Sequence, residues 1–257
     1  MSSLVITEDR GAVRHVVLNR PEKRNAFNGD LIQALGVELE AAGSDADVHC
    51  VVLRGAGVMF SSGMDLGSLR DLSEAPRDLR AFRGGILRYW NLCEEMTKPT
   101  IAVLHGACIG GALELALACD LRVAAAGTLL GLPETRVGLI PDVGGSSRLP
   151  QIVGLGRAKE LIMTGKLIDG TEAERIGLAN RVAPAEELEA ATQALVDELL
   201  ACAPVAVGLA KRVMDASARP ALAATLELEV AMQERCARSA DYAEGASAFR
   251  EKRQPRF

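Results

Sequence analysis

Apolar and polar positions along the first part of the chain follow patterns that predict strands and helices in turn. Short β-rich runs at residues 4–7 and 13–18 flank the polar stretch Glu8-Asp9-Arg10-Gly11, which predicts a hairpin. Apolar residues recur at helical spacing over residues 30–42 and predict an amphipathic helix. Residues 50–54 form a continuous apolar run, which is typical of a strand in a parallel sheet.

The same order of strand, glycine turn and helix occurs twice, at residues 50–72 and 100–119, and a third strand is expected at 121–125. A helical stretch at residues 77–97, ended by Lys98-Pro99, leads from the first unit to the second. Repetition of such units favours a right-handed, mostly parallel arrangement, so the predicted fold class is α/β.

Helices dominate the predicted structure of the second half. One is expected at residues 156–164, and the capping box Thr171-Glu172-Ala173-Glu174 predicts another, which Gly177 ends. The composition shifts at Pro184, and the helices expected after it span residues 186–200, 205–216, 222–238 and 242–252. We therefore expect a core at residues 1–190 and a C-terminal helical oligomerisation region at 191–257, whose apolar faces need the core or another subunit as partner.

Composition and charge narrow the functional classes. The 257 residues, with a mass of 27.2 kDa, suit one large domain or a domain with an appendage. A net charge of −5 and an aromatic content of 3% disfavour nucleic-acid binding. Six cysteines without a CxxC pair are expected to be reduced core residues, and three scattered histidines give poor support to a metal site. Without a basic and apolar leader or a run of membrane-spanning length, we expect a cytoplasmic protein with no membrane partner.

One stretch carries most of the candidate chemistry. Glu114 is the one carboxylate in the apolar helical run at residues 112–119, and a buried carboxylate is costly unless it is paired or protonated. Gly110 and Gly111 precede that helix, where free N–H groups and the helix dipole suit an oxyanion or a phosphate. An alternative interpretation is that Glu114 is a satisfied structural residue and that the glycines only allow tight packing.

Two further carboxylates follow in the sequence. Glu134 lies in Leu132-Pro133-Glu134, and Asp142 precedes Gly144-Gly145. If the fold brings Glu134 close to Glu114, the pair would supply a general acid and a general base. Asp142 is also explained as a simple turn residue ahead of the two glycines.

Five segments, in order and at compatible spacing, resemble the crotonase, or enoyl-CoA hydratase/isomerase, superfamily. They cover almost the whole chain and lie at residues 18–26, 60–66 (FSSGMDL), 105–120, 133–150 and 244–253. The resemblance implies a crotonase-like spiral of ββα repeats followed by a C-terminal helical trimerisation region, with trimers often paired into hexamers. It also implies an acyl-CoA thioester substrate and no cofactor beyond the coenzyme A that this substrate carries.

The resemblance implies roles for individual residues as well. The family's oxyanion hole uses two backbone N–H groups, which correspond to Met64 and Gly111, and its hydratases use two glutamates, which correspond to Glu114 and Glu134. One carboxylate would deprotonate the water that attacks the β carbon and the other would protonate the α carbon, and the sequence leaves open which does which. Asp142 resembles the proton-shuttling aspartate of dienoyl-CoA isomerases. Met64 stands where many members carry alanine and is expected to reshape the acyl pocket.

Contacts to the substrate and its coenzyme A are implied for two groups of residues. The first comprises Arg24, Ala26, Ser62, Gly63, Met64, Asp65, Leu66, Gly110 and Gly111. The second, Phe249 and Lys252, resembles C-terminal residues that reach the coenzyme A of a neighbouring subunit. The leading function is therefore a 2-enoyl-CoA hydratase. The alternatives are a Δ3,Δ2-enoyl-CoA or dienoyl-CoA isomerase, and a non-catalytic acyl-CoA- or RNA-binding scaffold, which the intact carboxylates and the acidic charge disfavour.

Overall fold

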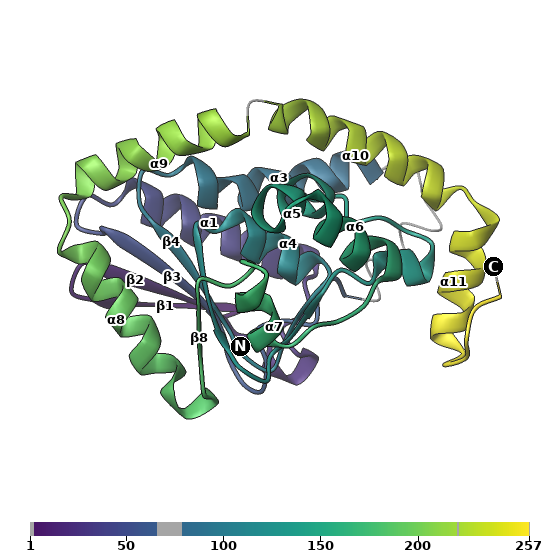
Figure 1. Ribbon diagram of the computed structural model, residues 1–257, viewed down its shortest axis with the longest axis horizontal. Coiled ribbons are helices and arrows are strands. Elements are labelled where there is room, and N and C mark those ends of the chain that lie inside the picture. The colour runs from purple at the N-terminus through teal and green to yellow at the C-terminus, as the bar shows by residue number, and fades with distance from the viewer. Residues whose placement is uncertain (1–2, 66–78, 220, 257) are drawn as a thin grey trace.

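A six-stranded sheet forms the centre of the molecule (Figure 1). The computed structural model describes residues 3–65, 79–219 and 221–256. The strand order is β1-β2-β3-β4-β6-β8, with β1 antiparallel to β2 and the later neighbours parallel, as the sequence predicts. These strands are β1 (Val5–Arg10), β2 (Val13–Leu18), β3 (Cys50–Gly55), β4 (Thr100–Leu104), β6 (Leu121–Ala125) and β8 (Arg181–Ala183).

The helices follow the predicted pattern, with one addition. They are α1 (Gly29–Ser44), α3 (Leu79–Glu95), α4 (Gly111–Ala118), α5 (Gly145–Val153), α6 (Leu155–Thr164), α7 (Gly170–Arg175), α8 (Leu188–Leu200), α9 (Pro204–Ala218), α10 (Leu222–Ala237) and α11 (Ala240–Arg250), with short 3-10 turns η1 (Pro21–Lys23), η3 (Glu134–Val137) and η4 (Ala185–Glu187). Helix α5 has no counterpart among the predicted helices, because its glycine start and the internal Pro150 weaken the helical pattern.

Two local predictions are wrong. The expected turn at residues 8–11 is mostly strand, because the backbone of β1 stays paired with β2 as far as Arg10. The expected capping box at Thr171 does not start α7. Asp169 caps that helix instead, and its side chain accepts the Glu172 N–H at 2.8 Å.

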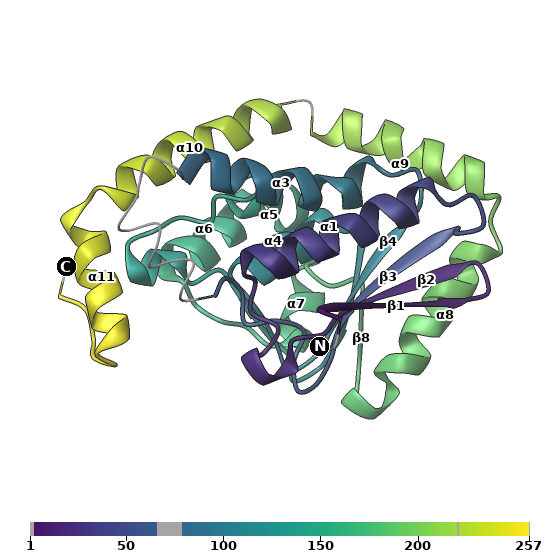
Figure 2. The same ribbon diagram turned by 180° about the vertical axis from the view of Figure 1, so that it is seen from behind.

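Alternate residues of the central strands pack into two separate cores. Val51 and Leu53 of β3 belong to the larger core, which lies between the sheet and helices α1, α3 and α4, while Cys50 and Val52 belong to the smaller one. Helix α8 covers the second face through a short apolar stripe that includes Leu195, and Figures 1 and 2 show it across the sheet from α1 and α3. Burial on both faces explains why these strands are mainly apolar.

A second, two-stranded sheet brings the glycine turns together. Strand β5 (Ala107–Ile109) pairs in parallel with β7 (Leu129–Gly131), so the stretch at residues 105–111, predicted as a turn, contains a strand. Ser61 forms a parallel bridge with Cys108 and accepts the Ile109 N–H at 3.4 Å. The segment after β3 therefore runs alongside β5, and its end reaches the start of α4.

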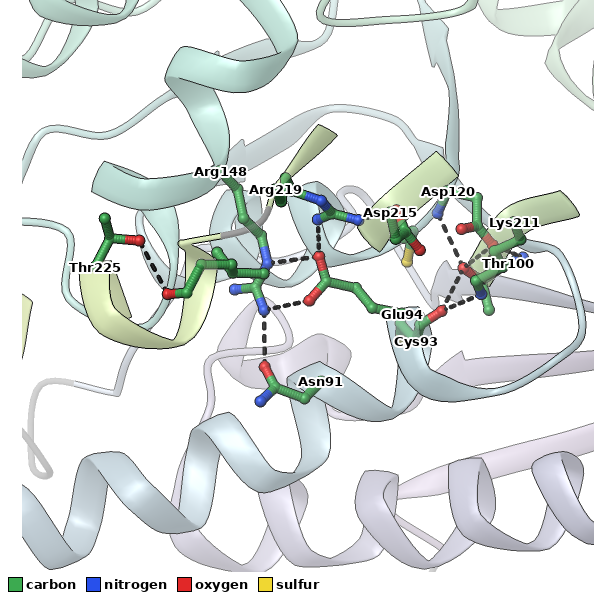
Figure 3. A network of polar contacts seen from close by, with 12 residues as sticks. Asn91, Cys93, Glu94, Thr100, Asp120, Arg148, Lys211, Asp215, Arg219 and Thr225 are labelled. Carbon is green, nitrogen blue, oxygen red and sulfur yellow. Dashed lines mark hydrogen bonds and ion pairs between the residues drawn. The ribbon is translucent and has the colours of Figure 1, made fainter. Parts of the chain in front are cut away.

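Helices α9 and α10 cross the molecule over the helical layer, and α11 lies at one end of the long axis (Figures 1 and 2). Two ion pairs attach α9 to the core of the same chain. Lys211 Nζ lies 2.8 Å from Asp120 Oδ2, and Arg219 pairs with Glu94 of α3 (Figure 3). Glu94 also binds the fully buried Arg148 of α5 through two hydrogen bonds of 3.0 and 2.7 Å.

Three further expectations concern the organisation of the chain. The boundary expected between residues 190 and 191 falls inside α8, and the division into core and oligomerisation region stays a prediction. Four of the six cysteines are buried as expected, whereas Cys202 is exposed and Cys236 is half-buried. No single helix in the described parts of the chain is long and apolar enough to cross a membrane. The helical segments at residues 185–200 and 204–218 reach that length and composition only when taken together, and they are bent by 100° where they join.

Candidate active site

All five residues predicted to act in catalysis line one cavity, which lies beside α3 and α10. They are Met64, Gly111, Glu114, Glu134 and Asp142. The space open to the centre of a water molecule is about 50 Å³, which is room for a few waters. The rest of the wall is mainly apolar and comprises Leu79, Phe82, Ile86, Leu139, Ile140 and Val143, with Arg83 and Gln233. The fold thus gathers three carboxyl groups into a small, largely apolar site.

Met64 and Gly111, whose amides are the expected oxyanion donors, lie close together at this cavity. A Cβ added to Gly63 would stand 3.5 Å from the Gly111 nitrogen, and one added to Gly111 would stand 3.3 Å from Met64 Sδ. Neither amide donates a hydrogen bond to another described residue, and the first amides of a helix have no partner within it. The Gly110 amide differs, because it donates to Gly131 O at 2.9 Å. The expectation that both glycine amides are free is therefore wrong for Gly110.

The Glu114 side chain is 3% exposed and is held by the loop that precedes α5. Its Oε1 accepts the Val143 N–H at 2.9 Å and the Gly145 N–H at 2.8 Å. Burial raises the pKa of Glu114 well above its ordinary value, and neighbouring carboxyl groups, Glu134 first, raise it further. Its Oε2 would lie 4.0 Å from a Cβ added to Gly111. One oxygen of Glu114 is thus anchored, and the other lies near Gly111.

Glu134 approaches the cavity from the first position of η3. Its Oε1 would lie 2.8 Å from a Cβ added to Gly110, and its Oε2 is buried without a hydrogen-bond partner among the described residues. Burial raises the pKa of Glu134 to about 8, with its own backbone N–H opposing the shift and the Asp142 carboxyl adding to it. Glu114 and Glu134 therefore line the same small cavity.

Asp142 lines the same cavity as the two glutamates and lies next to the Arg83 guanidinium. Arg83 donates to the Asp142 backbone O, and its Nε is 4.0 Å from Asp142 Oδ2. Burial raises the pKa of Asp142 to about 7, although Arg83 lowers it and the Glu229 carboxyl raises it. No group of three or more His, Cys, Asp or Glu side chains in the described ranges is placed to share a metal ion. Acids with raised pKa values in a shared cavity are suited to moving protons.

Comparison with known proteins assigns this chain to a family. The sequence profile described as Enoyl-CoA hydratase/isomerase matches residues 8–257. The chain belongs to the enoyl-CoA hydratase/isomerase, or crotonase, family. Enoyl-CoA isomerase/hydratase fer4 of Mycosarcoma maydis is 37% identical over 254 residues, covering 95% of this chain and 92% of that protein. Enoyl-CoA hydratase domain-containing protein 2, mitochondrial, of Homo sapiens is 40% identical over 254 residues, covering 97% and 86%.

Solved structures agree with this assignment. The crystal structure of an enoyl-CoA hydratase from Mycobacterium avium subsp. paratuberculosis K-10 matches with a TM-score of 0.87 and 29% identity, covering 99% of this chain and 98% of that chain. The crotonase fold expected from the sequence is thus confirmed. Membership of this family makes the chain an enzyme of the hydratase or isomerase class, and an acyl-CoA substrate fits the family.

Most of the residues expected to contact coenzyme A lie beside the cavity, in the loop at residues 20–28 and the segment at residues 61–65. We call these two segments the rim. The Ser62 N–H donates to Arg24 O at 3.0 Å, and the Phe27 N–H donates to Gly63 O at 2.8 Å. Arg24 adopts a left-handed backbone conformation, with a φ of 54°. The loop at residues 20–28 is therefore joined to the segment that carries the Met64 amide.

Arg20, which the sequence analysis did not single out, completes this rim. Its Nη1 donates to Ala26 O at 3.0 Å and lies 2.6 Å from Asp65 Oδ2. Leu66 and the helix expected after it, in the unit at residues 50–72, lie outside the described residues. Within the rim, Ala26 and Asp65 are thus linked by one guanidinium.

Phe249 and Lys252 lie elsewhere, on α11 and just after it. Both are exposed, and neither lines the cavity. Figures 1 and 2 show α11 at one end of the molecule. Their expected contact with the coenzyme A of a neighbouring crotonase subunit stays a prediction.

Three residues around the crotonase cavity were missed by the sequence analysis. Arg83 lies on the buried stripe of α3, and Glu229 and Gln233 lie on the buried stripe of α10, between apolar residues such as Leu226 and Val230. A polar or charged residue on the apolar face of an amphipathic helix is a signal that could have found them. What the sequence could not supply is the packing of α10 onto the loop before α5.

Proposed function

We propose that this chain is a hydratase that adds water across the double bond of a 2-enoyl-CoA thioester. The observation that carries the proposal is that Glu114, Glu134, Met64 and Gly111 line one cavity. Attack at the β carbon of such a thioester moves negative charge onto the thioester oxygen. Two fixed N–H donors stabilise that charge, and removal of one such donor typically costs about 3–4 kcal/mol.

The two glutamates would carry the protons of this reaction. An ionised carboxylate removes a proton from the bound water as its oxygen bonds to the β carbon, and a protonated carboxyl gives a proton to the α carbon. One acid gains the proton that the other loses, so that transfer between them or to solvent restores the site. The raised pKa values of Glu114 and Glu134 support the presence of a protonated acid near neutral pH.

The test is an assay on a short series of 2-enoyl-CoA esters that begins with crotonyl-CoA. Hydration consumes the conjugated double bond, so the absorbance of the enoyl thioester falls and the product gains the mass of one water. The proposal predicts both changes together. Loss of absorbance without that mass gain, or no reaction across the series, would overturn it.

Asp142 favours a second candidate, a Δ3,Δ2-enoyl-CoA or dienoyl-CoA isomerase. Its carboxyl lines the same cavity and its pKa is raised to about 7, mainly by burial, so that it could move a proton between two carbons. An isomerase would convert a 3-enoyl-CoA to its 2-enoyl isomer at constant mass. That reaction without any hydration of crotonyl-CoA would favour this candidate over the hydratase.

We further propose that the active form is a homotrimer, alone or paired into a hexamer. Helix α9 presents Val205, Leu209 and Val213 to solvent, four residues apart on one face. An apolar stripe of this kind favours burial against another copy of the chain. Such an assembly would also give Phe249 and Lys252 access to the coenzyme A bound to a neighbouring subunit.

A further inference from the structure

The loop that anchors Glu114 is held by side chains from two opposite directions. Glu114 of α4 accepts the N–H groups of Val143 and Gly145, at 2.9 and 2.8 Å. The amide between them, that of Gly144, donates in the other direction, to Glu229 Oε2 of α10 at 2.9 Å. Consecutive amides of one loop thus alternate between two buried carboxyl groups.

Helix α10 holds the same loop at a second point. Gln233 Oε1 accepts the Ile140 N–H at 3.0 Å, one turn along α10 from Glu229. Both side chains are 4% exposed, so water does not replace these bonds in the folded chain. A buried N–H that loses its acceptor is costly, and the loop would move to recover one. The position of the loop therefore depends on α10 as well as on α4.

We propose that Glu229 is a positioning residue for the reaction at Glu114: by fixing the Gly144 peptide, it keeps the two flanking amides aimed at the Glu114 carboxylate. This inference rests on the proposed function, because Glu114 is there assigned to proton transfer. Glu229 does not touch the substrate in this account. It acts through the backbone of the loop.

The backbone at this point leaves little freedom for other anchors. Gly144 has a φ of 109°, which an L side chain rarely adopts, and a Cβ on Gly145 would stand 2.8 Å from Glu114 Oε1. On the opposite side, Arg148 Nη1 donates to Val143 O at 3.2 Å. The peptide planes around Gly144 are thus fixed on each side, and Glu229 supplies the acceptor for its N–H.

The charged group next to Glu229, the Arg83 guanidinium, also supports a role for Glu229 in holding the loop. Arg83 Nη2 of α3 lies 3.5 Å from Glu229 Oε2 and donates to Leu226 O in the same helix as Glu229. Arg83 also donates to the backbone O of Asp142. One guanidinium thus joins α3, α10 and the loop, and it orients the Glu229 oxygen that accepts the Gly144 N–H.

Two conservative variants distinguish the effect of the length of the Glu229 side chain from the effect of its charge. Glu229→Asp keeps the charge but shortens the side chain by one methylene, so its carboxylate no longer reaches Gly144. Glu229→Gln loses the charge but keeps an oxygen at the same reach. Glu227→Asp is the matched control, because Glu227 lies on the same helix with an exposed side chain paired to Arg80.

The experiment measures kcat and KM on crotonyl-CoA, or on the best 2-enoyl-CoA ester, with the full-length chain. We expect Glu229→Asp to lower kcat by about ten- to a hundredfold with little change in KM, as a displaced catalytic group does. Glu229→Gln should keep kcat within about threefold of wild type, because it keeps an oxygen that accepts the Gly144 N–H. Glu227→Asp should do the same, because it leaves the loop unchanged. Wild-type kcat in Glu229→Asp, or an equal loss in Glu229→Gln, would overturn the inference.

Hydrogen–deuterium exchange of the segment at residues 141–146, without substrate, separates this inference from the proposed function. We expect faster exchange in Glu229→Asp and wild-type exchange in Glu229→Gln. If the wild type hydrates no enoyl-CoA, the proposed function fails, but faster exchange in Glu229→Asp would still support the anchoring of the loop. Unchanged exchange in Glu229→Asp would overturn that anchoring whether or not the wild type is active.

Discussion

Glu134 packs directly against Gly110, so closely that a Cβ on Gly110 would stand 2.8 Å from Glu134 Oε1. Gly110 has a φ of 59° and is the N-cap of α4, the helix that carries Glu114. One glycine thus serves two purposes: it allows the backbone turn into the catalytic helix and leaves space for the second glutamate. This contact ties the positions of the two proposed catalytic acids to each other.

We predict that Gly110→Ala lowers both the hydration rate and the stability of the fold. The methyl group displaces the Glu134 carboxylate, and a displaced catalytic group loses about a hundredfold in rate. A side chain at positive φ also costs about 1–3 kcal/mol of unfolding free energy. The measurements are kcat and the thermal unfolding curve. The control is Gly84→Ala on the exposed face of α3, where a Cβ meets nothing within 4 Å; normal kcat in Gly110→Ala would contradict this account.

Asp142 is predicted to make stability depend on pH. Burial raises its pKa from 3.8 to about 7, so between these values the folded chain holds a proton that the unfolded chain has released. The stabilisation is complete below the unfolded pKa and is lost as pH rises through the folded value. Asp142→Asn removes this dependence, so it should gain stability over wild type from about pH 5 to about pH 8. Melting temperatures across that range test the sign, and a gap that shrinks with pH would be inconsistent with a buried acid.

The ion-pair network in Figure 3 is predicted to contribute strongly to stability. Glu94 binds both Arg148, which is fully buried, and Arg219, the residue that follows α9. Glu94→Gln should cost about 3–5 kcal/mol of unfolding free energy, because it leaves the buried Arg148 without its carboxylate, whereas Arg219 keeps Asp215.

Denaturant unfolding measures this cost. Glu160→Gln is the control, since Glu160 pairs with Lys166 and Arg157 on the surface and should change stability by at most about 1 kcal/mol. Equal, small losses in both variants would show that the buried network adds nothing to stability.

The fold was largely predictable because its strands are buried on both faces. The apolar runs at residues 100–104 and 121–125 coincide with β4 and β6. The end of β1 was not predicted, since Glu8 to Arg10 are polar and exposed. Only the pairing of these residues with β2 makes them part of the strand. Local patterns thus located elements whose burial is complete and missed those that depend on a neighbour.

The residues of the site likewise divide into those that local motifs predict and those that depend on packing between distant segments. Motifs predicted Glu114, Glu134 and the Met64 and Gly111 amides, which now line one cavity. Glu229 was not predicted, because its contact with Gly144 spans 85 residues and depends on how α10 packs. The local sequence of α10 does not predict which loop the helix packs against.

Assembly is predicted to depend on the exposed stripe of α9. Leu209→Glu places a charge in the centre of that stripe and should convert a trimer or hexamer to monomers, because burying an unpaired charge is unfavourable. Light scattering after size-exclusion chromatography measures the mass. Val58→Glu, an exposed apolar residue far along the chain from α9, is the control. A monomeric wild type would contradict the proposed assembly.

The central claim is that Glu114 and Glu134 act on one water at one thioester, and the kcat of glutamine variants tests it most directly. Glu114→Gln and Glu134→Gln should each lower hydration of the best 2-enoyl-CoA ester by about a hundred- to ten-thousandfold. The double variant should fall little below the worse single variant, because the two groups act as a unit. A folded single variant that hydrates within about threefold of the wild-type rate would contradict the account.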